Sequence, residues 1–335
     1  MIRKKILSAL CFLILSGILI CGCSDDQKLP EALAEKKDSS GPSKSGSSKG
    51  GKNAGDKKEQ NKTPRDHTPK VLMPEASGTQ VFNNDFVTID ASHTDAGYFM
   101  VKYLGTNKKV KLRINGPDQS EYVYLLSGTD GFETFPLSGG SGAYLVQILE
   151  NAGGDMYAVA YSADLDVSIA DEFSPFLYPN QYVNFTKDSL TVQKGSELAE
   201  GAGSDLEVIE NIYHYVTSEI TYDEKKAASV TYGYLPVIDE TLKSGKGICF
   251  DYASVMSAML RTQGIPTKLE VGYSGEAYHA WISAYVSETG WVDDIIEFDG
   301  KSWTLMDPTL AANNSASSVK QYIGDGSNYV VKYSY

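Results

Sequence analysis

The sequence predicts a chain of several parts: a disordered tether, then a β-sandwich, then a domain of the α+β class. Residues 24–70 contain no aromatic residue and are dominated by Lys, Ser, Gly, Asp and Glu, so they cannot bury enough apolar surface to offset chain entropy. Short alternating strands separated by turn residues fill about 80–170. From about residue 204, apolar residues recur at helical spacing and alternate with further strands.

The first 23 residues have the pattern of a lipoprotein signal peptide. A basic start (3–5) precedes an apolar run (6–20) that is short for a membrane-spanning helix. The run closes on Ile-Cys-Gly-Cys-Ser, which resembles a bacterial lipobox, with small Gly22 before the cleavage and Cys23 as the lipid-modified residue. Cys21 fits less well because a bulky residue precedes it. The alternatives are an ordinary signal peptide or an uncleaved anchor.

Lipidation would fix the location of the protein. Acyl chains on Cys23 anchor it by burying methylenes in the bilayer. The tether, 24–70, would then hold the body near the membrane but free of it. We therefore expect an extracytoplasmic, membrane-anchored lipoprotein.

Residues 71–185 are expected to form an immunoglobulin-like sandwich. About seven short strands with turn signals between them are typical of that fold. The clearest expected strands are 86–89, 98–103, 110–114, 122–126, 143–148 and 156–161. This stretch contains no catalytic constellation.

Charge and composition exclude several classes of function. Residues 71–335 contain 16 basic and 35 acidic residues, a net charge of −19. Such a body repels phosphate backbones, so nucleic acid is excluded as a partner. The sequence has no phosphate-cradling glycine loop and no paired Cys or His metal signature. We therefore expect no cofactor and no metal.

Cys249 is the candidate nucleophile. It lies where a glycine-terminated loop (243–247) gives way to a helix-forming run that Gly264 and Pro266 stop. A thiol in the first turn of a helix feels the positive end of the macrodipole, which favours the thiolate. The other three cysteines lie in the N-terminal segment, so the exported body has one unpaired thiol. The alternative is a small buried hydrophobe.

Two further residues make a triad with this thiol. His279 begins a strand-like run, 278–286, and could serve as the base. Asp307 ends a short strand, 303–306, because the proline after it cannot donate to a ladder. A carboxylate there can hold an imidazole in one tautomer. Alone, a strand histidine is more often structural.

These motifs together resemble the core of the transglutaminase-like superfamily, which has a papain-like fold. They are Gly-x-Cys-x-Asp-Tyr-Ala (247–253), His-Ala-Trp (279–281) and Met-Asp-Pro-Thr (306–309), in the family's order. The resemblance covers about 186–312 and implies Cys249 as nucleophile, His279 as general base and Asp307 as orienter. An insertion at 292–298 departs from the family pattern. We assign 186–335 to this domain.

Elements around the triad support a packed domain. Ser204 to Glu207 forms a capping box, and the helix that follows carries an apolar stripe between 206 and 220. Residues 329–335 alternate as a last strand. Relatives often place an aromatic oxyanion donor upstream of the cysteine, which makes Tyr234 a candidate, although the backbone N–H of Cys249 is the safer donor.

The resemblance implies attack of the thiolate on a carboxamide or peptide carbonyl of a protein or peptide substrate, through an acyl-thioester. An amine acceptor makes a transglutaminase, and water makes a peptidase or deamidase. The competing class is a non-catalytic surface module that keeps the triad only as structure.

Overall fold

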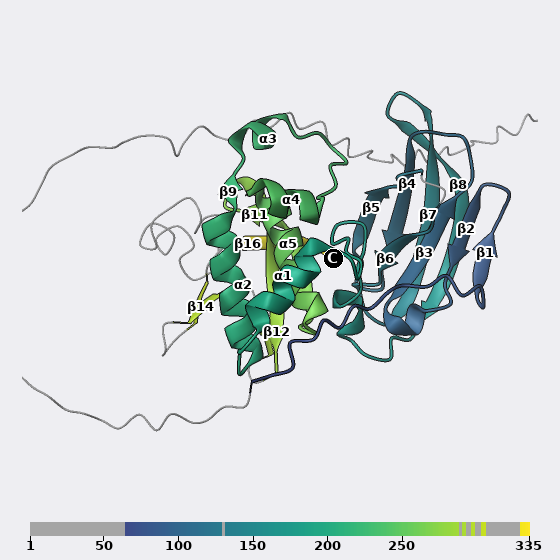
Figure 1. Cartoon of the computed structure of the whole chain (residues 1–335). Coiled ribbons are helices and arrows are strands. Elements are labelled where there is room, and N and C mark those ends of the chain that lie inside the picture. Colours follow the sequence, from purple (N-terminus) through teal and green to yellow (C-terminus); the bar gives the residue numbers. More distant parts are fainter. Residues whose placement is uncertain (1–63, 129–130, 288–289, 293–295, 299–302, 306–328) are drawn as a thin grey trace, which may run out of the picture. The chain divides into compact units, whose positions relative to one another are not determined.

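The computed structural model describes residues 64–128, 131–287, 290–292, 296–298, 303–305 and 329–335 (Figure 1). The predicted signal peptide, Cys23, Asp307 and most of the predicted tether lie outside these residues. Within the described ranges, no helix has both the length and the apolar character needed to cross a membrane.

The N-terminal part contains two antiparallel four-stranded sheets. One has the order β1 (Val81–Asn83), β2 (Val87–Asp90), β3 (Tyr98–Tyr103), β6 (Glu133–Pro136), and the other β5 (Glu121–Leu125), β4 (Val110–Asn115), β7 (Gly142–Gly153), β8 (Met156–Val167). Alternate residues of β4 are buried, and Leu112 and Ile114 share one hydrophobic cluster with Val87 and Ile89 of β2. The predicted alternating strands are present, with β7 and β8 about twice as long as expected. The immunoglobulin-like topology remains a prediction.

The C-terminal part combines helices with a four-stranded antiparallel sheet of order β13-β12-β11-β16. Its helices are α1 (Leu190–Ala199), α2 (Asp205–Glu219), α3 (Glu224–Ser229), α4 (Ile238–Ser244) and α5 (Cys249–Thr262). The sheet comprises β11 (Thr267–Ser274), β12 (Ala277–Val286), β13 (Gly290–Val292) and β16 (Tyr329–Ser334). Short pairs are β9 (Thr221–Tyr222) with β10 (Lys246–Gly247), and β14 (Ile296–Phe298) with β15 (Trp303–Leu305).

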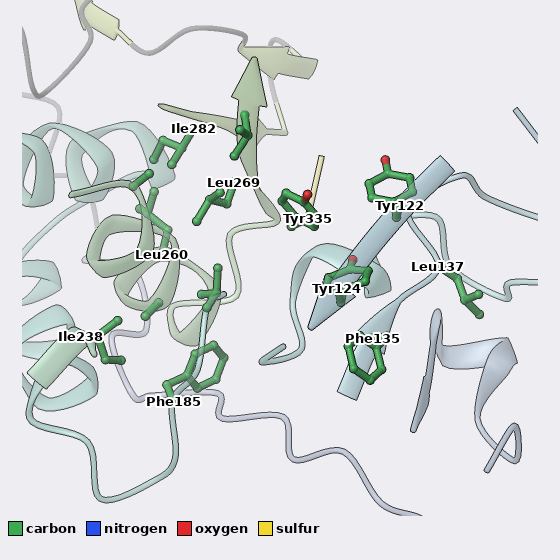
Figure 2. Close-up of a cluster of buried hydrophobic side chains, with 14 of the residues drawn as sticks. Tyr122, Tyr124, Phe135, Leu137, Phe185, Ile238, Leu260, Leu269, Ile282 and Tyr335 are labelled. Carbon is green, nitrogen blue, oxygen red and sulfur yellow. The ribbon is translucent and has the colours of Figure 1, made fainter. Parts of the chain in front are cut away.

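Helix α5 is the centre of this domain. Every side chain from Asp251 to Thr262 is buried, so the helix is covered on all sides rather than on one stripe. Leu260 lies beside Leu269 of β11 and Ile282 of β12 (Figure 2). Because strand side chains alternate, the α5-facing residues of β12 are the even-numbered ones.

Helix α1 is an element that sequence patterns do not indicate. Its N-terminal N–H groups, those of Leu190 and Thr191, donate to the carboxylate of Asp239, each over 3.0 Å. The Thr191 hydroxyl donates to the same carboxylate over 2.8 Å. The capping carboxylate therefore comes from α4, far along the chain, and no residue pattern near 190 predicts it. By contrast, the predicted cap of α2 is present, with Ser204 Oγ accepting from the N–H of Glu207.

Residues 64–70, the last seven of the predicted tether, contact the C-terminal domain. Arg65 forms an ion pair with Asp205 (2.9 Å) and donates to the carbonyl of Gln263 (2.8 Å). The carbonyl of His67 accepts from Ser196 Oγ, and the N–H of Lys70 donates to the carbonyl of Thr262. Polar residues that cannot build a core are held here by hydrogen bonds to helix ends, which composition does not reveal.

Arg261 joins three segments from inside the core. Its guanidinium donates to the backbone carbonyls of Thr267 at the start of β11, Tyr178 before α1, and Tyr335 after β16. Burial lowers the pKa of Arg261 to about 9, so the group stays charged at neutral pH. A buried cation is tolerated only when it is hydrogen-bonded, and every guanidinium nitrogen of Arg261 donates to a carbonyl.

Replacing this guanidinium by an apolar chain should be costly. We predict that Arg261→Met lowers the free energy of unfolding by about 3 kcal/mol, because buried carbonyls lose their donors. Arg113→Met on β4 is the matched control, since that guanidinium is partly exposed and bonds Gln147, and its cost should stay below about 1 kcal/mol. Urea unfolding of both variants tests this, and equal midpoints would contradict it.

Buried tyrosines predict a loss of stability at alkaline pH. Burial raises the pKa of Tyr144, Tyr182 and Tyr252, so these hydroxyls stay protonated in the folded state, while in the unfolded chain they ionise near pH 10. Their stabilising effect is thus complete below about pH 10 and declines as pH rises further. Tyr252→Phe should cost about 1 kcal/mol at pH 7, by losing the bond to the carbonyl of Ile220, yet show a shallower alkaline decline. Urea unfolding from pH 7 to 11 measures both, and parallel curves would contradict the assignment.

Candidate functional site

Cys249 is the first residue of α5, within the first turn where the sequence predicts it. Its thiol is free and half-buried. The N-cap residue is Ile248, in extended conformation, and it has no polar side chain to cap the helix. The capping contact comes from the opposite direction, since Asp251 Oδ2 accepts from the N–H of Ile248 over 2.8 Å. The carboxylate therefore fixes the residue immediately before the thiol.

The glycine before Ile248 is required by close packing. A Cβ on Gly247 would lie 2.7 Å from Cβ of Asp251 and 3.1 Å from Cγ2 of Thr241. Any side chain there would push Asp251 away from Ile248 and displace the start of α5. The Gly-x-Cys-x-Asp spacing is thus explained by local sterics as well as by helix capping.

Tyr234, the candidate oxyanion donor, has another partner in the structure. Its hydroxyl donates to Asp251 Oδ1 over 2.5 Å. Burial, with this hydrogen bond to a carboxylate, raises the pKa of Tyr234 well above its ordinary value, so the group remains a neutral donor. Because a phenol has one proton to give, the bond to Asp251 competes with the oxyanion role. The backbone N–H of Cys249 remains the alternative donor.

His279 lies near the start of β12 and is half-buried. It pairs across the ladder with Gly272 of β11, and its ring stacks on Trp281 with centroids 6.2 Å apart. By alternation, His279 and Trp281 share one face of the sheet, while Ala280 and Ile282 belong to the cluster that packs on α5.

Tyr182 packs beside the residue that follows the candidate nucleophile. Its ring lies 5.3 Å from the ring of Phe250, which follows Cys249. Burial raises the pKa of Tyr182, and the electrostatic effect of the phenols of Tyr232, Tyr278 and Tyr333 raises it further.

Two of the predicted site residues, Asp307 and Cys23, lie outside the described residues. The predicted strand before Asp307 is present as β15, which pairs with β14 inside the insertion. Sequence reasoning gave no role to Asp251 or to Lys226, whose ammonium lies 2.8 Å from Asp251 Oδ2. An acidic residue at the third helical position was the available signal for Asp251, and nothing in the sequence marked Lys226.

The C-terminal domain is similar to the transglutaminase-like superfamily. Residues 193–308 match the family model described as Transglutaminase-like superfamily. The matched range starts within α1 and includes Cys249, His279 and Asp307. The mixed helices and sheet of the domain agree with the α+β class that the sequence predicts.

Individual proteins resemble the chain more weakly. It is 28% identical over 222 residues to the UPF0252 protein MJ1282 of Methanocaldococcus jannaschii. The aligned region covers 59% of this chain and 59% of the relative. A candidate cysteine protease of Cytophaga hutchinsonii is similar with 17% identity and a TM-score of 0.33, over 63% of this chain and 78% of that one. The periplasmic domain of TgpA from Pseudomonas aeruginosa is similar with 13% identity and a TM-score of 0.32, over 73% of this chain and 98% of that one.

Thiol reactivity tests whether His279 acts on Cys249. We predict that iodoacetamide modifies Cys249 rapidly near pH 7 and that His279→Ala slows the reaction about tenfold, because the imidazole favours the thiolate. Cys249→Ala gives the background from other thiols. His214→Ala is the matched control, since His214 is an exposed residue of α2. Equal rates in the wild type and His279→Ala would remove His279 from the site.

Proposed function

We propose that the protein is a membrane-anchored, extracytoplasmic enzyme that uses Cys249 to transfer acyl groups from the amide bonds of protein or peptide substrates. The observation that carries this proposal is a free thiol at the first position of a buried helix, within a domain that is similar to the transglutaminase-like superfamily. That family uses a cysteine nucleophile. The His-Ala-Trp motif at 279–281, which lies inside the matched range, supports His279 as its base.

The chemistry follows from the residue types. His279 takes the proton of the Cys249 thiol, and Sγ attacks the carbonyl carbon of a carboxamide or peptide bond. The tetrahedral intermediate expels ammonia or an amine, which receives the proton from the imidazolium, and an acyl-thioester remains. Attack by an amine or by water then releases the acyl group and restores the thiol. Asp307 is proposed to orient the imidazole during these proton transfers.

The acceptor decides between two enzymes. A thioester reaches an amine only where water is excluded or an amine is positioned. We propose transglutaminase-like transfer to an amine as the reaction. The alternative is peptidase or deamidase activity, in which water is the acceptor. The net negative charge of the body favours cationic partners such as lysine side chains, by attraction at a distance.

Location and domain organisation complete the proposal. Lipidation of Cys23 after removal of the signal peptide would anchor the chain, and the segment from residue 24 would separate the membrane from the body. We assign 71–185 to the β-sandwich domain and 186–335 to the catalytic domain. Residues 64–70, which contact the catalytic domain, would place the chain's entry point on it.

A second candidate function is a non-catalytic surface module. One observation favours it: strand alternation assigns His279 to the face of β12 that carries Trp281, whereas the opposite face packs on α5. In such a module Cys249 would be a structural residue of the first turn.

One assay separates these functions. The full chain in detergent is incubated with glutamine-containing peptides and a fluorescent primary amine, beside Cys249→Ala. We expect amine incorporation that depends on Cys249. Ammonia release or peptide cleavage without incorporation indicates hydrolysis, and no reaction beyond that of Cys249→Ala supports the module.

A further inference from the structure

The Asp251 carboxylate is fully buried beneath the first turn of α5 and has three donors. Oδ2 accepts from the N–H of Ile248 (2.8 Å) and from the ammonium of Lys226 (2.8 Å), and Oδ1 accepts from the hydroxyl of Tyr234 (2.5 Å). A carboxylate in the protein interior is stable only when it is paired and hydrogen-bonded. Lys226 supplies the opposite charge, and the other two donors add one neutral hydrogen bond to each oxygen.

We propose that Asp251 is a positioning residue for Cys249, held in place by Lys226 of α3 and by Tyr234 of the loop 230–237. This inference rests on the proposed function, because it assigns these residues to the same nucleophile. None of the three acts on the substrate; each acts through the backbone that presents the thiol.

The path from the carboxylate to the thiol is short. Asp251 holds the N–H of Ile248, and the next peptide carries Cys249 into the first turn. The backbone angles of Ile248 decide where that turn begins, and with it the direction of the Cys249 side chain. A shift of the carboxylate would therefore change how the thiol meets the helix dipole and its base.

Lys226 and Tyr234 also contact each other. The Lys226 ammonium lies 4.5 Å from the centre of the Tyr234 ring, in cation–π contact. Lys226 is itself fixed, since its N–H donates to the Asp223 side chain that caps α3. The loop is bounded on its other side by the β sheets, because a Cβ on Gly233 would lie 2.5 Å from Cδ1 of Leu125 in β5. The contacts of Lys226 and Tyr234 with Asp251 thus hold the loop 230–237 against the start of α5.

A positioning role differs from a merely structural one in what it changes. Loss of a structural contact lowers stability and leaves the chemistry of the folded thiol unchanged. Loss of a positioning contact alters the pH at which the thiol becomes reactive, even in protein that remains folded. The pH profile of alkylation therefore separates the two roles.

The experiment uses the full chain in detergent and iodoacetamide as the probe. Tyr234→Phe removes one hydrogen bond, and Lys226→Met removes the charge, with Lys226→Arg as its conservative partner. Tyr103→Phe is the matched control, because it deletes a hydroxyl that donates to a carboxylate, Glu150, in the β sheets. Cys249→Ala gives the background, and urea unfolding at pH 7 measures stability.

We expect Tyr234→Phe and Lys226→Met to move the midpoint of the alkylation profile upward by about one pH unit, which is about tenfold in rate below the midpoint. Lys226→Arg and Tyr103→Phe should keep the wild-type midpoint. The proposal is overturned if both test variants keep the wild-type profile, or if their only effect is on stability, including failure to fold. Alkylation needs no substrate, so a profile that depends on this cluster, without amine incorporation or hydrolysis, would refute the proposed function alone.

Discussion

The C-terminal domain depends on two buried charged side chains of helix α5, both of which need hydrogen-bond partners. Asp251 lies near the start of α5 and Arg261 near its end, and both side chains are inside the protein. Water is not available to either, so each needs partners from other segments. Asp251 is bound by α3 and by the loop before α4. Arg261 is bound by backbone carbonyls at the start of β11, just after β16 and in the segment before α1. The polar contacts of one helix therefore set where much of the C-terminal domain lies.

Apolar and aromatic packing adds to the hydrogen bonds of these two side chains. The side chains of α5 between these charges meet β11 and β12, and the rings of Tyr122 and Tyr124 in β5 lie 5.6 and 5.7 Å from the ring of Tyr335 (Figure 2). Aromatic pairs at these separations contribute beyond the area they bury. The same cluster includes Tyr182, which contacts Phe250 beside the candidate nucleophile. Packing and site geometry are consequently inseparable at the start of α5.

How far the sequence could predict this arrangement follows from the distance over which each signal acts. The limits of β3, β12 and α5 were predicted to within about one residue, because strand alternation and helix start signals are local. Cys249 was predicted in the first turn of this helix for the same reason. The cap of α1, supplied by Asp239, and the Lys226 partner of Asp251 join residues far apart in the chain, and a single sequence carries no trace of such pairing. The contacts of Arg65 were missed because a polar, glycine-rich stretch resembles a solvated one until its helix-end partners are known.

The attachment of residues 64–70 has a mechanical consequence. Arg65 binds at the end of α5 away from Cys249, through Gln263, and also pairs with Asp205 at the start of α2. A pulling force transmitted along the chain ahead of residue 64 would load these bonds first. It would reach the C-terminal domain before the β sheets. Because Cys249 lies at the opposite end of α5 from Gln263, strain entering at these bonds would have to cross the length of the helix before it reached the thiol.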